Sequence, residues 1–290
     1  MSTHAFYIVD VFAEEKYVGN QLAVVLRAHD LSASEMQQIA REMHFSETTF
    51  ILSDNEHAGG YDVRIFTPNA QVAFAGHPTL GTAFVIREEI VRSAATDVTL
   101  NLRIGPIPVR FDGDVLWMKQ IAPTFGGTRL LEEVAPVLGL EVADIDARFP
   151  VQEVSTGLPF LIVPLKRLDA VRRAQVSQRP LTALLRDKLA AGILIFAPET
   201  YHPENQLNVR VFVPELGVPE DPATGSANGC LAGYLVKHRY FAMAEIEGRV
   251  EQGYEIQRPS LLFLRAREKG NAIEVNVGGK VFLVARGELY

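Results

Sequence analysis

The chain has 290 residues, of which 48% are hydrophobic and 22% charged, and its formal net charge is −7. The length leaves room for a large core and favours roughly two domains, and the composition is typical of a globular protein. The negative charge argues against nucleic acid as a partner. No uncharged apolar run reaches the length of about 18 residues that a membrane span requires, so no membrane association is expected.

The first residues lack the basic region, apolar core and cleavage site of a secretory signal. Cys230 is the single cysteine, which excludes an internal disulfide and fits a reducing cytoplasm. One cysteine and seven scattered histidines give no metal-ligand spacing, and the sequence contains no dinucleotide-binding loop or cofactor-binding lysine motif. We therefore expect a cytoplasmic protein that uses no cofactor.

The first half of the chain is predicted to consist of strands around two helices. Ser32 and Glu35 form a capping-box pattern, and Leu31 and Met36 stand where a hydrophobic staple requires them. The apolar spacing that follows predicts a helix that ends near His44. The strands expected in this half cover residues 6–12, 22–26, 61–67, 98–104, 107–111 and 115–120, with a further strand that ends at residue 52.

The second half repeats this order of elements. Helices are expected near residues 130–138 and 181–189. The expected strands cover residues 160–164, 192–197, 208–213, 250–255, 261–266, 273–278 and 281–287. Neither half shows the regular strand–helix alternation of a parallel sheet, so each is predicted to be a mostly antiparallel barrel or curved sheet around one helix.

One phrase of the sequence occurs twice. Residues 77–83 (HPTLGTA) align without gaps on residues 221–227 (DPATGSA), and the strand 63–68 upstream of the first matches residues 209–214. The offsets, 221 − 77 = 144 and 209 − 63 = 146, are about half the chain length. This pattern indicates an internal duplication and an α+β fold of two pseudo-symmetric lobes.

Each copy of the phrase is expected to open a buried helix. Asp221 before Pro222 predicts a helix start, with Asp as the N-cap and Pro in the first turn, and His77 occupies the equivalent cap. The segment from Pro222 to Val236 carries no charge, so its helix should be buried on every side. The N–H groups at such a helix start form a site for an anion, which predicts an anionic small-molecule ligand.

A breaker-rich segment near the midpoint of the chain, Pro123–Thr128, marks the expected domain boundary. We therefore assign an N-terminal lobe to residues 1–124 and a C-terminal lobe to residues 125–290.

Three ordered motifs make the chain resemble the phenazine-biosynthesis PhzF-like family over essentially its whole length. They are residues 46–50 (SETTF), 74–81 (FAGHPTLG) and 221–227 (DPATGSA). The family is similar in fold to diaminopimelate epimerase, with two barrel-and-helix lobes and an active site between them. The resemblance implies a cofactor-independent isomerase that moves protons on a small cyclic or amino-acid-like acid. It also implies a homodimer and a C-terminal strand, from about residue 281, that packs on the N-terminal lobe.

The site residues that the resemblance implies are the general acid/base Glu47, the site-lining residues His77 and Asp221, and the substrate-holding residues Gly76, Gly225 and Ser226. The residues themselves leave alternatives open. Glu47 at the head of a strand is either a carboxyl whose pKa burial raises toward neutrality or a solvated loop side chain. Asp221 is either an N-cap alone or a cap that also binds substrate.

The cysteine count bears on the mechanism. An epimerase with a pair of thiols needs two cysteines, and Cys230 stands one turn inside the second buried helix, where core packing explains it. A proton shift by one carboxyl group is the leading interpretation. The alternatives are an amino-acid epimerase that uses Glu47, Asp221 or His77 as opposed bases, and a family member that only binds a small molecule or a partner.

Overall fold

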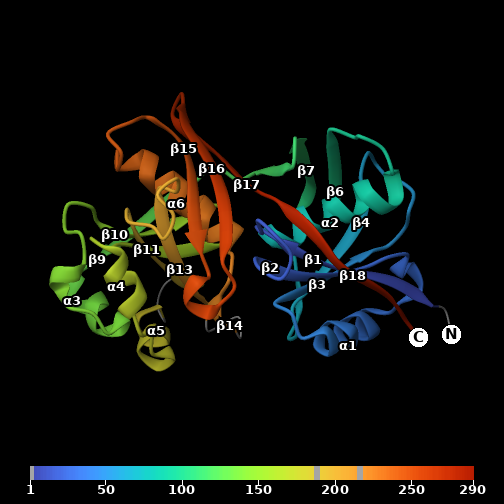
Figure 1. The fold of residues 1–290 in the computed structure, drawn as a ribbon, viewed down its shortest axis with the longest axis horizontal. Coiled ribbons are helices and arrows are strands. Elements are labelled where there is room, and N and C mark those ends of the chain that lie inside the picture. Colours follow the sequence, from blue (N-terminus) through green and yellow to red (C-terminus); the bar gives the residue numbers. More distant parts are fainter. Residues whose placement is uncertain (1–2, 186–189, 214–217) are drawn as a thin grey trace. The chain divides into compact units, whose positions relative to one another are not determined.

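The computed structural model describes residues 3–185, 190–213 and 218–290 (Figure 1). The chain divides into two compact units, which we call the first and second unit. The first unit comprises Met1–Met118 together with Gly278–Tyr290, and the second comprises Lys119–Val277. Strands contain more residues than helices in the described part of both units, in accordance with the predicted α+β class.

The first unit is a mainly antiparallel sheet around α2. Its helices are α1 (Ala33–Met43) and α2 (Gly76–Val85), and α2 continues into a π-helical segment, Ile86–Val91. Its strands are β1 (His4–Val11), β2 (Asn20–Val25), β3 (Glu47–Ile51), β4 (Tyr61–Phe66), β5 (Gln71–Val72), β6 (Asp97–Leu102), β7 (Gly105–Asp112), β8 (Val115–Lys119) and β18 (Val281–Leu289).

The second unit has the same character around α6. Its helices are α3 (Leu131–Val134), which a 3₁₀ turn extends to Leu138, α4 (Leu168–Arg173), α5 (Gln178–Leu185) and α6 (Gly225–Lys237). Its strands are β9 (Thr124–Arg129), β10 (Val151–Ser155), β11 (Pro159–Pro164), β12 (Gly192–Ala197), β13 (Leu207–Val213), β14 (Val218–Asp221), β15 (Glu245–Gln252), β16 (Ser260–Lys269) and β17 (Ala272–Gly279).

The two units repeat one order of strand pairing. In the first unit β1–β2 is antiparallel, β2–β3 parallel, β3–β4 antiparallel and β4–β6 parallel. In the second unit β10–β11, β11–β12, β12–β13 and β13–β15 follow the same sequence of orientations. The first strand of each unit has one further antiparallel partner, β18 for β1 and β9 for β10. Six strands of the first unit therefore have assigned counterparts in the second: β1, β2, β3, β4, β6 and β18 correspond to β10, β11, β12, β13, β15 and β9.

Both central helices are buried, as their uncharged sequences predict. Every residue of α2 except Phe84 is buried, and so is every residue of α6 except Ser226 and Lys237. Small residues allow the close packing: a Cβ on Gly81 of α2 would lie 2.6 Å from a methyl carbon of Leu22 in β2. The apolar faces of the surrounding strands thus close over the helix within each unit.

Local sequence signals located some elements correctly and missed others. The capping box of α1 is formed, with the Ser32 side chain accepting from the Glu35 N–H and the Glu35 carboxylate accepting from the Ser32 N–H. The strands β5, β9, β10 and β14 and the helix α4 were not predicted. Part of the helix expected at 181–189 is α5, and residues 186–189 lie outside the described residues.

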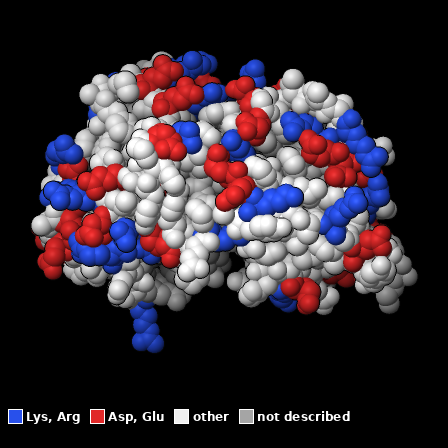
Figure 2. Space-filling model, viewed as in Figure 1, with Lys and Arg blue, Asp and Glu red and all other residues white. Residues whose placement is uncertain are grey.

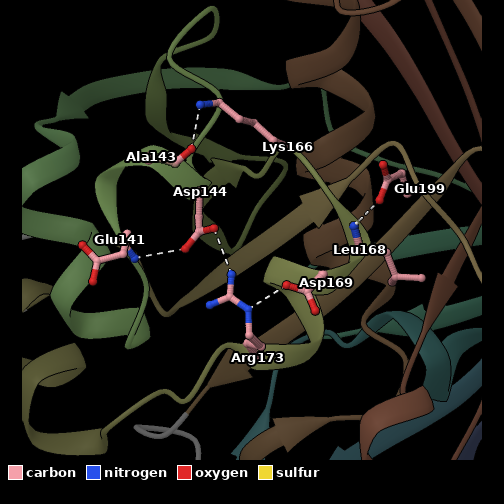
Figure 3. A network of polar contacts seen from close by, with 8 residues as sticks. All are labelled: Glu141, Ala143, Asp144, Lys166, Leu168, Asp169, Arg173 and Glu199. Atoms are coloured by element: carbon pink, nitrogen blue, oxygen red, sulfur yellow. Dashed lines mark hydrogen bonds and ion pairs between the residues drawn. The ribbon is translucent and has the colours of Figure 1, made fainter.

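Charged side chains lie mainly on the surface, and Figure 2 shows basic and acidic groups interspersed over the face in view. One exposed network joins α4 to the loop before β10, where Arg173 donates to Asp144 and Asp169 (Figure 3). No helix among the described residues is both long and apolar enough to cross a membrane. Within the same residues, no group of three or more potential ligands is arranged to hold a metal ion.

Candidate active site

The first unit brings two of the predicted site residues together. Glu47 begins β3 and pairs in parallel with Leu22 of β2, and His77 is the second residue of α2. The side chains are 17% and 6% exposed, and Glu47 Oε2 lies 3.5 Å from His77 Nε2. This distance exceeds the usual hydrogen-bond range, so the two groups are in contact without a hydrogen bond between these atoms.

His77 is held in its neutral form. Burial lowers the pKa of His77 from 6.5 to about 3, and a hydrogen bond with the Gln21 backbone raises it by a smaller amount. At neutral pH the contact with Glu47 is therefore not an ion pair. A neutral imidazole keeps one donor and one acceptor nitrogen, so it can polarise or orient a neighbouring group without carrying charge.

The position of α2 is fixed by contacts with β3 and β2. The hydroxyl of Thr82 in α2 donates to the hydroxyl of Thr49 in β3 at 2.8 Å, and both residues are fully buried. Gly76 is the first residue of α2 and is buried. The first N–H groups of a helix have no partner inside the helix, and the helix dipole adds positive potential there. The start of α2, beside Glu47, is thus suited to an anionic group.

The second unit gathers the other predicted residues, but with different geometry. Asp221 is the last residue of β14 and is 7% exposed. The helix begins at Gly225 after the N-cap Thr224, so the prediction that Asp221 caps it with Pro222 in the first turn is wrong. The Asp221 carboxylate instead accepts a short hydrogen bond from the Thr224 hydroxyl, which closes a turn that leads into α6.

The equivalent prediction for α2 is also corrected. His77 lies inside the first turn of α2 and Pro78 follows it there, while the N-cap is Ala75. A proline in the first turn costs nothing because its missing N–H has no partner in the helix. The aligned phrase thus starts a helix in the first unit and forms a turn in the second.

A buried residue that sequence reasoning missed is hydrogen bonded to the turn before α6. The Gln252 amide donates to the Asp221 carbonyl at 2.7 Å and to the Thr224 hydroxyl at 3.0 Å. Its oxygen accepts from the Thr224 N–H and from the Asn228 side chain. Gln252 lies in β15, is fully buried and belongs to no recognisable motif, so no sequence signal pointed to it.

The remaining predicted residues occupy the first turn of α6. Gly225 and Ser226 are its first two residues, and the Ser226 carbonyl accepts from the Thr156 hydroxyl at 3.4 Å. Cys230 is fully buried in the next turn, and burial raises the pKa of its thiol to about 11. A thiol that stays protonated and inaccessible fits the predicted packing role.

The strand order also identifies the counterpart of Glu47. Strand β10, which ends at Ser155, is the counterpart of β1 and therefore not of β3. The counterpart of β3 is β12, which begins at Gly192. A Cβ at Gly192 would lie 2.4 Å from the Phe212 carbonyl oxygen, so this position of the second unit has no room for a side chain. The carboxyl group at this strand start belongs to the first unit alone.

The family model for "phenazine biosynthesis-like protein" matches residues 9–287. The chain belongs to the phenazine biosynthesis-like, or PhzF, family. Among the relatives of this PhzF-family chain is the trans-2,3-dihydro-3-hydroxyanthranilate isomerase of Pseudomonas aeruginosa. It is 35% identical over 294 residues, which cover 99% of this chain and 100% of that one. The family and enzyme class predicted from the motifs, an isomerase, are confirmed.

Solved structures agree on the fold of this PhzF-family chain. A PhzF-family phenazine biosynthesis protein of Bacillus anthracis aligns with a TM-score of 0.92 at 29% identity and covers 100% of both chains. A hydroxyproline epimerase of Agrobacterium vitis aligns with a TM-score of 0.64 at 10% identity, which shows a shared fold only. The neighbours are therefore PhzF-family and epimerase-like folds, as predicted.

Proposed function

We propose that this protein is a cofactor-independent isomerase that shifts a proton on a small cyclic or amino-acid-like carboxylic acid. Glu47 is the general acid/base, and His77 and Asp221 position and polarise the substrate. The observation that carries the proposal is the pairing of a partly buried carboxyl group with a neutral imidazole, at 3.5 Å, beside the start of a buried helix.

The proposed reaction needs no oxidant, reductant or leaving group. The Glu47 carboxylate takes a proton from one carbon of the substrate, and the electron pair of that C–H bond moves into the conjugated system. The resulting carboxylic acid returns the proton to another carbon of the same system. Both steps use one side chain, so the proton stays on one face of the substrate, and a proton transfer of this kind contributes about 10²–10⁴ in rate.

Binding is assigned to the helix starts and to Asp221. The N–H groups of Gly76 and of Gly225 and Ser226 begin α2 and α6, where a substrate carboxylate is favoured. Asp221 is 7% exposed, and its negatively charged carboxylate suits a substrate ammonium group. Neutral His77 supplies a donor or an acceptor next to Glu47.

A two-base epimerase remains the alternative, and two observations disfavour it. Gly192 stands at the strand start that corresponds to Glu47, so no second carboxyl group occupies the equivalent position. Cys230 is buried with a raised pKa, so Cys230→Ser is expected to leave turnover near that of the wild type.

The test uses trans-2,3-dihydro-3-hydroxyanthranilate, the compound in the name of the Pseudomonas relatives, together with a panel of cyclic amino acids. Glu47→Gln is nearly isosteric and should lower turnover by about 10²–10⁴ while leaving the melting temperature and substrate binding largely intact. Glu42→Gln, an exposed residue of α1 in the same unit, is the matched control and should change neither.

Solvent-deuterium incorporation into substrate decides the role of Glu47. Wild type and Glu42→Gln should exchange deuterium into the acid, and Glu47→Gln should not. If Glu47→Gln exchanges at the wild-type rate, another group carries the proton and the assignment fails. Inversion at a stereocentre without a double-bond shift would favour the epimerase. The homodimer that the resemblance implies stays a prediction, which light scattering checks.

A further inference from the structure

The turn that carries Asp221 has no equivalent in the first unit. In the aligned phrase, His77 and Pro78 lie in the first turn of α2, whereas Asp221 and Pro222 precede α6. The helix of the second unit therefore begins about one turn later. The backbone N–H and C=O groups of this segment lack the hydrogen bonds that a helical turn would provide. They need other partners, because buried N–H and C=O groups are almost always hydrogen bonded.

Gln252 supplies several of these partners. Its side-chain nitrogen donates to the Asp221 carbonyl and the Thr224 hydroxyl, and its oxygen accepts from the Thr224 N–H and the Asn228 amide. One fully buried side chain thus makes four hydrogen bonds with both ends of the segment 221–228. The Asn228 amide adds a bond to the Thr224 carbonyl, which ties the same turn to α6.

The strand register shows that this amide is particular to the second unit. Asp62 of β4 pairs with Asn101 of β6, and their side chains are hydrogen bonded. Asn208 of β13 pairs with Glu251 of β15 in the same way, with acid and amide exchanged.

The residue that follows these paired positions differs between the units. After Asn101 it is the buried apolar Leu102, and after Glu251 it is Gln252. The second unit, in which a turn precedes the central helix, therefore has a glutamine at the place where the first unit has a leucine.

We infer that Gln252 is a positioning residue that holds Asp221 and the first N–H groups of α6 in the geometry that binds substrate. This inference rests on the function proposed above for Asp221, Gly225 and Ser226. Gln252 acts through them and touches no reacting atom. A glutamate at 252 would lose both amide donors and bring a second negative charge to the turn, so the amide itself is required.

The first experiment needs no substrate. Amide hydrogen exchange, measured by mass spectrometry, is compared in wild type, Gln252→Leu and Glu251→Gln. Leucine is the residue at the corresponding place of the first unit, and Glu251 is a fully buried control on the same strand whose bonds go to residues 201–208. Gln252→Leu should speed exchange in 221–228 at least about tenfold and leave β12 and α2 unchanged.

The control and the contrary outcomes are distinct. Glu251→Gln should not change exchange in 221–228. If Gln252→Leu speeds exchange throughout the second unit, its role is general stability and the inference is overturned. If exchange in 221–228 does not change, the turn does not depend on Gln252 and the inference is also overturned. If Gln252→Leu does not fold, Gln252→Glu and Thr224→Val take its place, since each removes part of the same network.

The second experiment measures turnover of an acid from the panel that the wild type converts. Gln252→Leu should raise KM at least about tenfold with a smaller effect on kcat. The double variant Asp221→Asn, Gln252→Leu should lose less than the product of the two single losses, because both changes act on one turn. Wild-type kinetics in Gln252→Leu, together with an inactive Glu47→Gln, would overturn the inference alone. A wild type that converts no acid of the panel would count against the proposed function and leave the exchange result standing.

Discussion

His77 shows how burial sets the chemistry of a single residue. Its ring is almost fully enclosed by α2 and the neighbouring strands, and this burial outweighs the hydrogen bond with the Gln21 backbone, which favours protonation. The neutral ring of His77 can form a hydrogen bond beside Glu47. It carries no positive charge that would keep the Glu47 carboxylate ionised. A carboxyl group that must both take and return a proton benefits from such a neighbour.

The buried imidazole predicts a pH dependence of stability. Its pKa is about 3 in the folded chain, against 6.5 for an unperturbed histidine. Between pH 3 and pH 6.5 the unfolded state binds more protons than the folded state. The stabilisation that comes from burying neutral His77 is therefore complete above about pH 6.5 and is lost as the pH falls toward 3. The contribution to the slope approaches about 1.4 kcal/mol per pH unit.

Urea unfolding at pH 7, 6, 5 and 4 measures this slope. The variant His77→Asn should lose less stability over this range than the wild type, and His57→Asn, an exposed histidine of the same unit, should follow the wild type. Parallel curves for wild type and His77→Asn would show that His77 is not the group responsible.

Ion pairs of two kinds join the elements of the second unit. Arg210 of β13 and Glu220 of β14 are about 10% and 11% exposed, and the guanidinium donates two hydrogen bonds to the carboxylate. Burial alone lowers the pKa of Arg210, but the hydrogen bonds and charge of Glu220 outweigh it, and the pKa is raised. The pair therefore stays charged in the interior and holds β14, with Asp221 at its end, against β13.

Removing one member of this pair should be costly. Glu220→Gln leaves the Arg210 charge buried without its counter-charge, and such changes cost about 3–5 kcal/mol. Arg173→Ala in the exposed network of Figure 3 is the control and should leave the melting temperature nearly unchanged, because exposed pairs stabilise little. Thermal unfolding of both variants tests the contrast, and equal shifts would contradict it.

The elements that sequence reasoning located are those whose signals are local. The Ser32–Glu35 capping box and the uncharged run of α6 each act within a few residues, so the pattern alone predicts them. The start of α6 was misplaced because Asp-Pro serves equally as a helix cap or as a turn, and the turn is hydrogen bonded to Gln252, some 30 residues away, which no local pattern reveals. The counterpart of Glu47 was likewise decided by strand register, which no short motif encodes.

At the scale of the whole chain, the two units differ in continuity. The second unit is one segment, Lys119–Val277, and it contains β9, the antiparallel partner of β10. The first unit is made of two segments, because β1 pairs with β18 from His4–Leu289 to Val11–Val281. Without β18, β1 would present an unpaired edge, which promotes aggregation.

This difference predicts how fragments behave. Residues 119–277 should fold alone, giving a cooperative thermal transition by circular dichroism. Residues 1–118 should aggregate or remain unfolded, and joining 278–290 to their N-terminus through a flexible linker should restore folding. The control carries the same linker with a scrambled 278–290 sequence, which should not restore folding. A folded 1–118 fragment would contradict the prediction.

The pairing of β1 with β18 also concerns synthesis. The ribosome adds residues at about 5–20 per second, so the 290 residues take about 15–60 s to appear. During that time β1 lacks its partner β18, which is synthesised last. The whole second unit emerges before β18 and can fold first. Glu47, the proposed proton carrier, lies in the unit that closes last, so a nascent or truncated chain would contain the proposed substrate-binding turn of Asp221 before the unit of Glu47 is complete.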